Sequence, residues 1–297
     1  MSRIVCVRAP NPSAMTLDGT NSYLIFGDGE AICIDPGPPI AAHVDRLVRE
    51  AAAGNARIAA ICVTHGHPDH APAARPLALA TGADVHAYAS GMRDGETAAV
   101  RGTSVMAYEA PGHTADSLVF YETKERALFT GDVVLGTGTV VIAPPGGDMR
   151  AYQATLARLR ARFGDARTLY GGHGPPVGDP RAKLDEYVEH RRVREAEIVA
   201  QLETHDCTIP QIVRHVYARV DALLWPAAAR QVLAYLQALE HEGRVRSREA
   251  GAPPTQEDAA MLDPDWSTLA GANDARVIEA ELGASMTLGA ARVYSLA

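Results

Sequence analysis

Four potential metal ligands lie within six consecutive residues of the chain: His65, His67, Asp69 and His70. Three imidazoles and a carboxylate crowd together at low cost only where something positive organises them. A divalent cation does so, with nitrogen and oxygen ligands at roughly 2.0–2.2 Å. A histidine-rich polar turn on the surface is the alternative interpretation. Further residues of the right kind downstream favour the metal site.

Three such residues follow, each in a glycine-containing turn after an apolar run: His113, Asp132 and His173. Glycine allows unusual backbone angles and a close approach of the chain to a ligand. Each residue taken alone is a weak signal. In this order, and at the ends of predicted strands, they indicate one site that gathers all seven side chains.

The elements that must position these side chains are strands and helices in alternation. Ile58–Val63 is typical of a buried strand and Ala71–Ala80 of a helix, so the first four ligands lie on a strand-to-helix turn. Further strands and helices are predicted at Ser22–Phe26, Ala31–Ile34, Ile40–Ala53, Ser104–Tyr108, Leu118–Tyr121, Ala127–Thr130 and Arg150–Arg162. This interleaving predicts a layered α/β architecture. Asp35 is interpreted as a structural residue of an Asp-Pro-Gly turn.

The order H-x-H-x-D-H, then a lone His, a lone Asp and a final His, resembles the metallo-β-lactamase-fold hydrolase superfamily. The resemblance implies an αββα sandwich with two metal ions in a groove at one edge of the two sheets. It also implies a first metal site of three histidines, a second site of one aspartate and two histidines, and a bridging aspartate. The first site would consist of His65, His67 and His113, and the second of Asp69, His70 and His173. The bridging aspartate would be Asp132.

Four further segments are similar to the β-lactamase-like protein 2 branch, which resembles glyoxalase II in its catalytic domain. They are Thr20–Leu24, Gly131–Gly136, Tyr170–Pro175 and the helical His190–Glu195. The resemblance implies a small C-terminal winged-helix domain. Members of this branch include an endoribonuclease for single-stranded RNA and thioesterases for carrier-bound polyketides, so the branch indicates the chemistry better than the substrate.

The expected domains are therefore a catalytic domain over residues 1–200, a winged helix over 201–250 and an acidic extension over 251–297. Thr208 is a plausible helix cap with Pro210 in the first turn, Pro226 opens another helix, and Arg244–Arg248 suits a wing strand. Residues 182–250 hold ten Lys and Arg against eleven Asp and Glu. That balance disfavours a nucleic-acid surface, which needs concentrated positive charge.

Two further segments carry open interpretations. A helix is predicted from Arg181 to Glu203, and it carries a basic cluster: His190, Arg191, Arg192 and Arg194. This cluster is either a solvated face, paired with nearby glutamates, or a wall of the groove that holds the anionic tail of a substrate. The extension, with seven acidic residues and two arginines, either caps the winged helix or forms a tail. Apolar positions suggest that it partly folds: Ile278, Leu282, Met286, Leu288 and Val293.

Composition and the N-terminal sequence indicate where in the cell the protein is expected. The chain has 297 residues and a formal net charge of −8, and its apolar runs are too short to cross a bilayer. The N-terminus lacks the apolar core of a signal peptide, so we expect a cytoplasmic protein that does not associate with membranes. The scattered cysteines are expected to be buried thiols outside any disulfide framework: Cys6, Cys33, Cys62 and Cys207.

The resemblance implies a hydrolase with two divalent metal ions and a metal-bridging hydroxide, in which Asp132 bridges the ions and Asp69 orients the nucleophile and passes a proton to the leaving group. Zinc suits imidazole and carboxylate ligands, but without a sulfur ligand iron and manganese remain open. The favoured substrates are acyl thioesters, either small molecules or carrier-bound. Specificity is expected from the groove, with Asn21, Tyr23, the loop Thr137–Asp148 and the winged helix as candidates.

Three alternatives stay open. One is a single-strand endoribonuclease, which the charge balance disfavours. Another is a lactonase or β-lactamase. The third is a non-catalytic binding protein, although such proteins often lose ligands and this chain retains all seven. The sequence indicates neither the individual substrate nor an oligomeric state.

Overall fold

The computed structural model describes residues 3–264 and 292–297, and its chain forms two compact units. The first unit comprises residues 1–140 and 155–185, and the second comprises residues 141–154 and 186–297. Two helices, α3 (Met149–Phe163) and α4 (Pro180–Thr204), contribute residues to both units.

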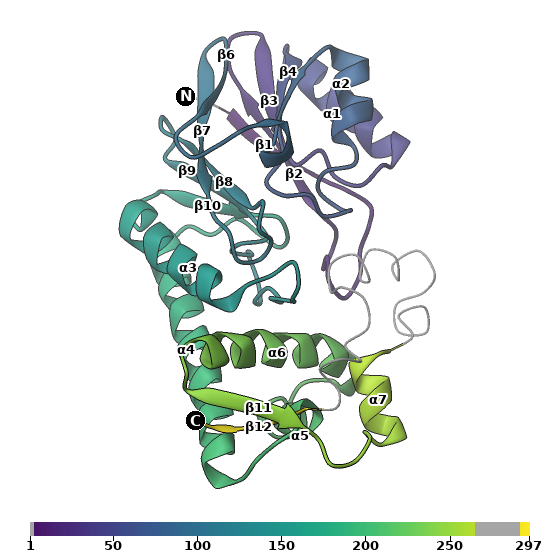
Figure 1. Cartoon of the computed structure of the whole chain (residues 1–297). Helices are drawn as coiled ribbons and strands as arrows, with labels where there is room; N and C mark the ends of the chain where they lie inside the picture. The colour runs from purple at the N-terminus through teal and green to yellow at the C-terminus, as the bar shows by residue number, and fades with distance from the viewer. Residues whose placement is uncertain (1–2, 265–291) are drawn as a thin grey trace. The chain divides into compact units, whose positions relative to one another are not determined.

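The first unit contains two five-stranded sheets (Figure 1). One sheet has the order β1 (Arg3–Arg8), β2 (Asn21–Phe26), β3 (Glu30–Ile34), β4 (Arg57–Cys62) and β5 (Asp84–His86). The other has the order β10 (Thr168–Gly171), β9 (Ala127–Gly131), β8 (Leu118–Glu122), β7 (Thr103–Glu109) and β6 (Thr97–Val100). Parallel pairing joins β3 to β4, β4 to β5 and β9 to β10, and the other neighbours are antiparallel.

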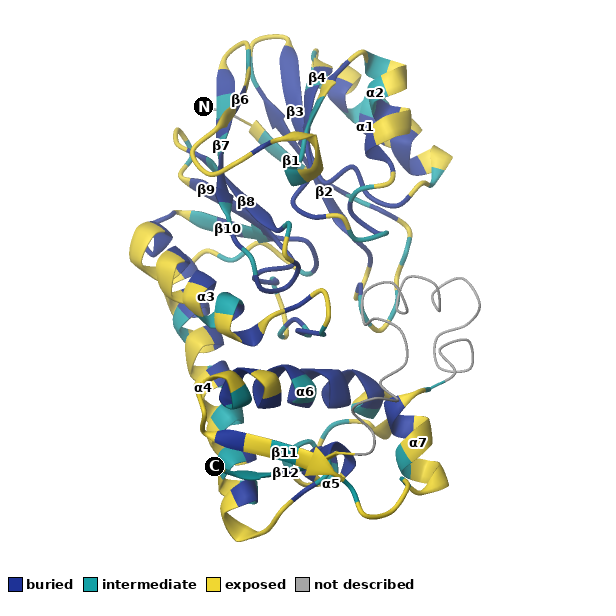
Figure 2. Ribbon diagram, viewed as in Figure 1, coloured by how far each residue is buried: buried dark blue, intermediate teal, exposed yellow. Residues whose placement is uncertain are grey.

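Alternating side chains of β2 divide between two hydrophobic clusters. Tyr23 and Ile25 pack with residues of both sheets, whereas Leu24 and Phe26 pack on the opposite face with α1 (Ala41–Ala53) and α2 (Ala74–Thr81). Because successive side chains of a strand point to opposite faces, one strand serves both layers. Figure 2 shows β3 and β9 fully buried between the outer layers.

The second sheet is covered by the C-terminal part of α3. The ring of Phe163 lies 4.9 Å from those of Tyr108 and Tyr121. The layers of the first unit are therefore helix, sheet, sheet and helix, which confirms the predicted αββα sandwich.

The expected strands and helices of the first unit are present, with one clear shift. Helix α2 begins at Ala74 instead of Ala71, because residues after the ligand turn bond elsewhere. The amides of His70 and Ala71 donate to the carbonyl of His67, and the amide of Ala73 donates to the carbonyl of Gly37. The short strands β5 and β6 and the 3₁₀ turn Tyr88–Ser90 were not predicted.

The second unit contains the rest of α4 together with α5 (Ile209–Val216), a 3₁₀ turn (Ala222–Leu224), α6 (Trp225–His241), β11 (Val245–Glu249), α7 (Gln256–Leu262) and β12 (Arg292–Leu296). Thr208 is the N-cap residue of α5, and its amide donates to Gln211 Oε1 at 2.8 Å. Pro226 lies in the first turn of α6. These starts agree with the sequence signals.

The basic cluster of α4 has two kinds of member. Arg192 forms an exposed ion pair with Glu189, as a solvated face requires. Arg194 pairs with Glu197 but is half-buried, because its guanidinium lies over the ring of Tyr217. For Arg191 that interpretation is wrong, because its side chain is only 2% exposed. Its Nη1 donates to Gln231 Oε1 at 3.1 Å, and its guanidinium lies over the ring of Tyr152.

The C-terminal extension supplies one strand to the second unit. β12 pairs antiparallel with β11, and Val293 lies in this strand opposite Arg248. The other apolar positions of the extension lie outside the described residues: Ile278, Leu282, Met286 and Leu288. The last residues of the chain thus complete a two-stranded wing.

All four cysteines are free thiols. Cys33, Cys62 and Cys207 are buried, as expected, but Cys6 is exposed because it lies on the edge strand β1. Among the described residues, none of the helices combines the length and the apolar character that crossing a membrane requires.

One buried histidine of α1 should make stability depend on pH. His43 Nε2 lies 2.9 Å from Ser22 Oγ, and burial, followed by the nearby Arg46, lowers the pKa of His43 to about 4. The unfolded chain takes up this proton near the ordinary pKa of 6.5 and the folded chain does not. The free energy of unfolding should therefore fall as the pH is lowered from 6.5 towards 4.

Urea unfolding of the chelator-treated protein at pH 7.5 and pH 5 measures this effect. His43→Gln should show a smaller loss of stability between the two pH values than the unchanged protein. His241→Gln, which alters an exposed histidine, serves as the control. Equal losses in the unchanged protein and in His43→Gln would contradict the assignment.

Candidate metal centre

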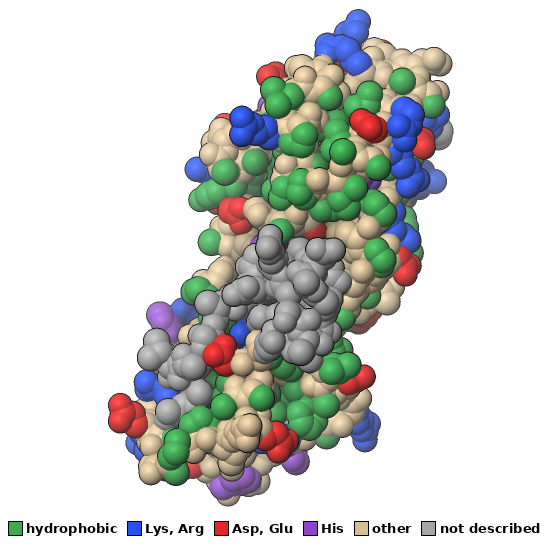
Figure 3. Space-filling model, turned by 90° about the vertical axis from the view of Figure 1, so that its right-hand side faces the viewer, with side chains coloured by type: hydrophobic (Ala, Val, Ile, Leu, Met, Phe, Trp, Pro, Cys, Tyr) green, Lys and Arg blue, Asp and Glu red, His purple; other side chains and the backbone are tan. Residues whose placement is uncertain are grey.

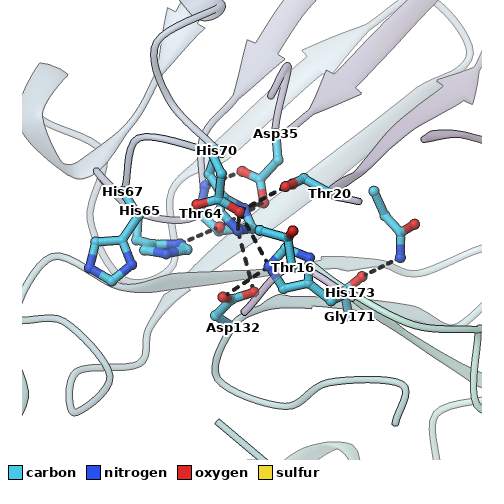
Figure 4. A network of polar contacts seen from close by, with 12 residues as sticks. Thr16, Thr20, Asp35, Thr64, His65, His67, His70, Asp132, Gly171 and His173 are labelled. Atoms are coloured by element: carbon cyan, nitrogen blue, oxygen red, sulfur yellow. Dashed lines mark hydrogen bonds and ion pairs between the residues drawn. The ribbon is translucent and has the colours of Figure 1, made fainter. Parts of the chain in front are cut away.

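All seven side chains predicted to bind metal converge at one end of the first unit. Four lie on the loop after β4, and one lies on each of the loops that follow β7, β9 and β10. Figure 4 shows several of these side chains pointing toward one another from separate loops. In chain order the seven are His65, His67, Asp69, His70, His113, Asp132 and His173.

The donor atoms fall into three overlapping groups, each spanning no more than 4.8 Å. One group is His65, His67 and His113, and another is Asp69, His70 and His173. These two groups coincide with the ligand sets that the sequence resemblance implies. The third group joins Asp132 to His65 and His70, one member of each set. Asp132 therefore lies where a bridging carboxylate would be needed.

The separations between donor atoms suit a small cation. Asp69 Oδ2 lies 3.2 Å from His70 Nε2 and 3.3 Å from His173 Nε2, and Asp132 lies 3.3 Å from each of the same nitrogens. Ligands at about 2.0–2.1 Å from a tetrahedral metal are separated from one another by about 3.3 Å. In the other group, His67 Nδ1 and His113 Nε2 are 3.1 Å apart.

In the group Asp69, His70 and His173, the aspartates and the histidines shift one another's pKa values. Burial opposes the charged form of His70, but Asp69, Asp132 and Asp35 together raise its pKa well above the usual range. Burial likewise opposes protonation of His173, whose pKa is nevertheless raised to about 10, chiefly by Asp132. The pKa values of Asp69 and Asp132 lie well below their usual range despite burial, because these histidines face them. Two buried carboxylates thus require positive charge between them, which a divalent cation supplies.

The first group consists of neutral imidazoles. Burial, with the neighbouring histidines His70, His67 and His113, lowers the pKa of His65 well below its usual range. Burial and then His113 lower the pKa of His67 to about 3. A neutral imidazole offers a lone pair, which is the form that binds a metal.

Several buried atoms in the cluster have no hydrogen-bond partner among the described residues. They are His65 Nε2, Asp69 Oδ1, His70 Nε2 and Asp132 Oδ1. Buried polar atoms are rarely left without partners, so a gathering of four marks a place where a ligand belongs. The residues present therefore fit a divalent metal centre.

Asp35, interpreted from the sequence as a turn residue, orients one histidine in each group. Its Oδ2 accepts from His70 Nδ1 at 2.8 Å, which turns His70 Nε2 toward the cluster. Both its oxygens accept from Thr64, through the amide and the hydroxyl at 2.7 Å each. Since the Thr64 hydroxyl proton is used in this way, its oxygen accepts from His65 Nδ1 at 3.0 Å. The Nε2 atom of His65 is then left with a lone pair.

Asn21 and Tyr23, which were expected to contribute specificity, are buried and hold the His173 loop. Asn21 Nδ2 donates to the carbonyls of Gly171 and Gly174, and the Tyr23 hydroxyl donates to the carbonyl of Gly171 at 2.7 Å. That loop needs its glycines, because a Cβ at Gly172 would overlap Asp132 Oδ1. The Thr-Asn-Ser-Tyr motif was the sequence signal for this role.

Comparison with known families agrees with this geometry. The family model described as "Metallo-beta-lactamase superfamily" matches residues 15–103 and 91–173, and "Beta-lactamase associated winged helix domain" matches residues 208–252. The chain belongs to the metallo-beta-lactamase superfamily, and it is a metal-dependent hydrolase with a winged-helix domain.

Similar proteins indicate the branch of the superfamily to which the chain is related. A beta-lactamase-like protein 2 homolog from Caenorhabditis elegans is 32% identical over 80% of this chain and 84% of its own length. An atrochrysone carboxyl ACP thioesterase from Aspergillus chevalieri is 30% identical over 73% of this chain and 74% of its own length. A metallo-beta-lactamase family protein from Thermus thermophilus has the same fold, with a TM-score of 0.68 and 22% identity over 82% of this chain and 95% of its own.

Replacing Asp35 by Asn should weaken metal binding while the fold is retained. Asn tolerates the positive φ of 49° at this position, but its side chain cannot accept all the hydrogen bonds that Asp35 accepts. Losses of partners that orient metal ligands lower metal affinity by about 10–100-fold.

Metal content after dialysis against a chelator of graded strength, measured by elemental analysis, checks this expectation. The matched control is Asp94→Asn, which removes a carboxylate that accepts only from the amide of Glu109 among the bonds found in the described residues. Retention of metal by Asp35→Asn at the level of the control would show that Asp35 does not orient the ligands.

Proposed function

We propose that this protein hydrolyses acyl thioesters, small or carrier-bound, with two divalent cations held by the seven-residue cluster. The observation that carries the proposal is that cluster, in which carboxylates and imidazoles converge at 3.1–3.3 Å. Bound there, two cations would lower the pKa of a water molecule to near neutrality and polarise the carbonyl of the substrate.

The residues of the chain divide the work around the substrate. His65, His67 and His113 would hold one cation, and Asp69, His70 and His173 would hold the other. Asp132 shares a donor group with one histidine of each set, so it would contribute to both. Asp69 presents Oδ2 to the two histidines, whereas Oδ1 is buried and has no hydrogen-bond partner among the described residues. Oδ1 is therefore the atom that orients the attacking water, takes its proton and passes it to the departing thiolate. The products are a carboxylic acid and a thiol.

A covalent alternative has little support. The structure contains a hydrogen-bonded serine–histidine pair, Ser22 and His43, and both side chains are buried. His43 Nδ1 has no hydrogen-bond partner in the described part of the chain, so no carboxylate orients this histidine. A serine nucleophile needs both access to substrate and an oriented base.

Charge supports an acyl substrate over RNA. Two arginines of the wing region are engaged by carboxylates, since Arg244 pairs with Glu195 and Arg248 pairs with Asp206. On the face shown in Figure 3, basic side chains lie among acidic and uncharged ones and, apart from a group along the upper right-hand edge, do not form a continuous basic surface. Binding of a polyanion depends on such a surface. The similarity to a carrier-protein thioesterase points the same way.

Zinc is the proposed metal. The donors are imidazole nitrogens and carboxylate oxygens, and the separations near 3.3 Å suit tetrahedral bonds of about 2.0–2.1 Å. Iron and manganese accept the same donors and provide the comparison.

A hydrolysis screen on protein of measured metal content tests the proposal. Zinc-loaded protein should cleave acyl N-acetylcysteamine thioesters and leave single-stranded RNA intact, because the site supplies an activated water and the wing arginines Arg244 and Arg248 are already paired with carboxylates. Asp132→Ala should reduce thioester cleavage to the background rate, since this carboxylate joins the two ligand groups.

Asp45→Ala, at an exposed position of α1, is the matched control and should retain full activity. RNA cleavage that disappears in Asp132→Ala, without thioester cleavage, would reject the acyl substrate but keep the metal centre. Activity that survives in Asp132→Ala would reject the site itself.

A further inference from the structure

We infer that Thr20, held by Asn11, is a positioning residue that sets the affinity of the second metal site, Asp69–His70–His173, independently of the first. The inference rests on the proposed two-metal centre. It comes from the hydrogen bonds of the segment 19–23, which enters β2 beside the cluster.

Thr20 makes a direct contact with a proposed ligand. Its hydroxyl donates to Asp69 Oδ2 at 2.7 Å, and both side chains are buried. Figure 4 shows Thr20 approaching the cluster from the same side as Asp35. The bond falls on the same carboxylate oxygen that faces His70 Nε2 and His173 Nε2. Thr20 therefore fixes the orientation in which Asp69 presents this oxygen to a cation.

Asn11 determines the direction of the Thr20 hydroxyl proton. The backbone amide of Thr20 donates to Asn11 Oδ1, and Asn11 Nδ2 donates to Thr20 Oγ1, both at 2.9 Å. The first bond identifies which end of the Asn11 amide is oxygen, so the other end must be the donor. Because Thr20 Oγ1 accepts from Asn11, its own proton goes to Asp69.

The same segment also holds the other end of the second site. His173 Nδ1 donates to the carbonyl of Gly19 at 3.3 Å, which leaves Nε2 facing Asp69 and Asp132. The amide of Asn21 donates to the carbonyl of Gly172 at 2.7 Å. Residues 19–21 thus restrain two of the three ligands of the second site.

The first site is supported by other residues. His65 is oriented by Thr64, and His67 lies against His113. Among the described residues, the hydrogen bonds found for Asn11 and Thr20 do not reach these three histidines. A change at Thr20 should therefore act on one site and spare the other.

Cobalt titration of chelator-treated protein, followed by calorimetry and by visible absorption, tests this selectivity. Unchanged protein should bind two equivalents of Co²⁺. In Thr20→Val, which keeps the shape and removes the donor, one of the two binding events should weaken by about 10–100-fold while the other is unchanged. Thr20→Ser should restore the affinity because it restores the hydroxyl.

Thr103→Val is the matched control, since Thr103 is also buried and donates to a carboxylate, that of Glu122. It should bind two Co²⁺ ions with unchanged affinities. Thermal unfolding of the metal-free proteins shows whether each variant folds. Should Thr20→Val not fold, Asn11→Ala provides the second variant, with a smaller weakening of the same binding event expected.

The outcomes separate this inference from the proposed function. Two binding events of unchanged affinity in Thr20→Val, or equal weakening of both events, would overturn the role of Thr20 and leave the metal centre intact. A single equivalent of Co²⁺ in the unchanged protein would overturn the two-metal centre and the inference with it.

Discussion

The structure depends on one electrostatic constraint: three carboxylates, Asp35, Asp69 and Asp132, are buried within one group of histidines. Burying an unpaired charge is far more costly than burying a paired one, so each carboxylate must face positive charge or several donors. Asp35 meets this need with protein donors. Asp69 accepts one hydrogen bond, from Thr20, and otherwise faces His70 and His173, as Asp132 does, so these two carboxylates call for a cation or for protonated histidines. The surrounding protein must hold the donors in place, since they would otherwise turn outward to water.

The sandwich provides that restraint through its strand ends. Apolar residues of β4, β7 and β9 pack between the two sheets, so the ligand-bearing loops that follow these strands start from rigid positions. Hydrogen bonds then act within the loops: Asp35 orients a histidine of each group, and the entry to β2 holds the His173 loop. Two kinds of interaction thus fix the geometry of the site. Packing positions the loops, and polar contacts determine which ring nitrogen each oriented histidine presents.

Much of this organisation could be predicted from the sequence, because it is recorded in local patterns. Apolar runs indicated most of the strands, and the spacing from His65 to His70 indicated the ligands. What escaped prediction depends on contacts between distant residues. Asp35 was interpreted as a turn residue because its bond to His70 spans 35 positions. The solvated face, one of two interpretations given for the basic cluster, was wrong for Arg191 because Gln231 and Tyr152, which enclose this side chain, lie on other helices. Similarly, α2 begins late because of a bond from Ala73 to Gly37.

The pairing of β12 with β11 has a consequence for how the chain can be handled. Within the described residues, β12 is the only strand that pairs with β11. Shortening the chain by residues 292–297, which composition alone would present as a dispensable tail, would expose the amides and carbonyls of Val245–Glu249. A strand left open in this way is a template for association with a second molecule, so self-aggregation is a hazard of trimming. Residues 292–297 therefore protect β11 from such association.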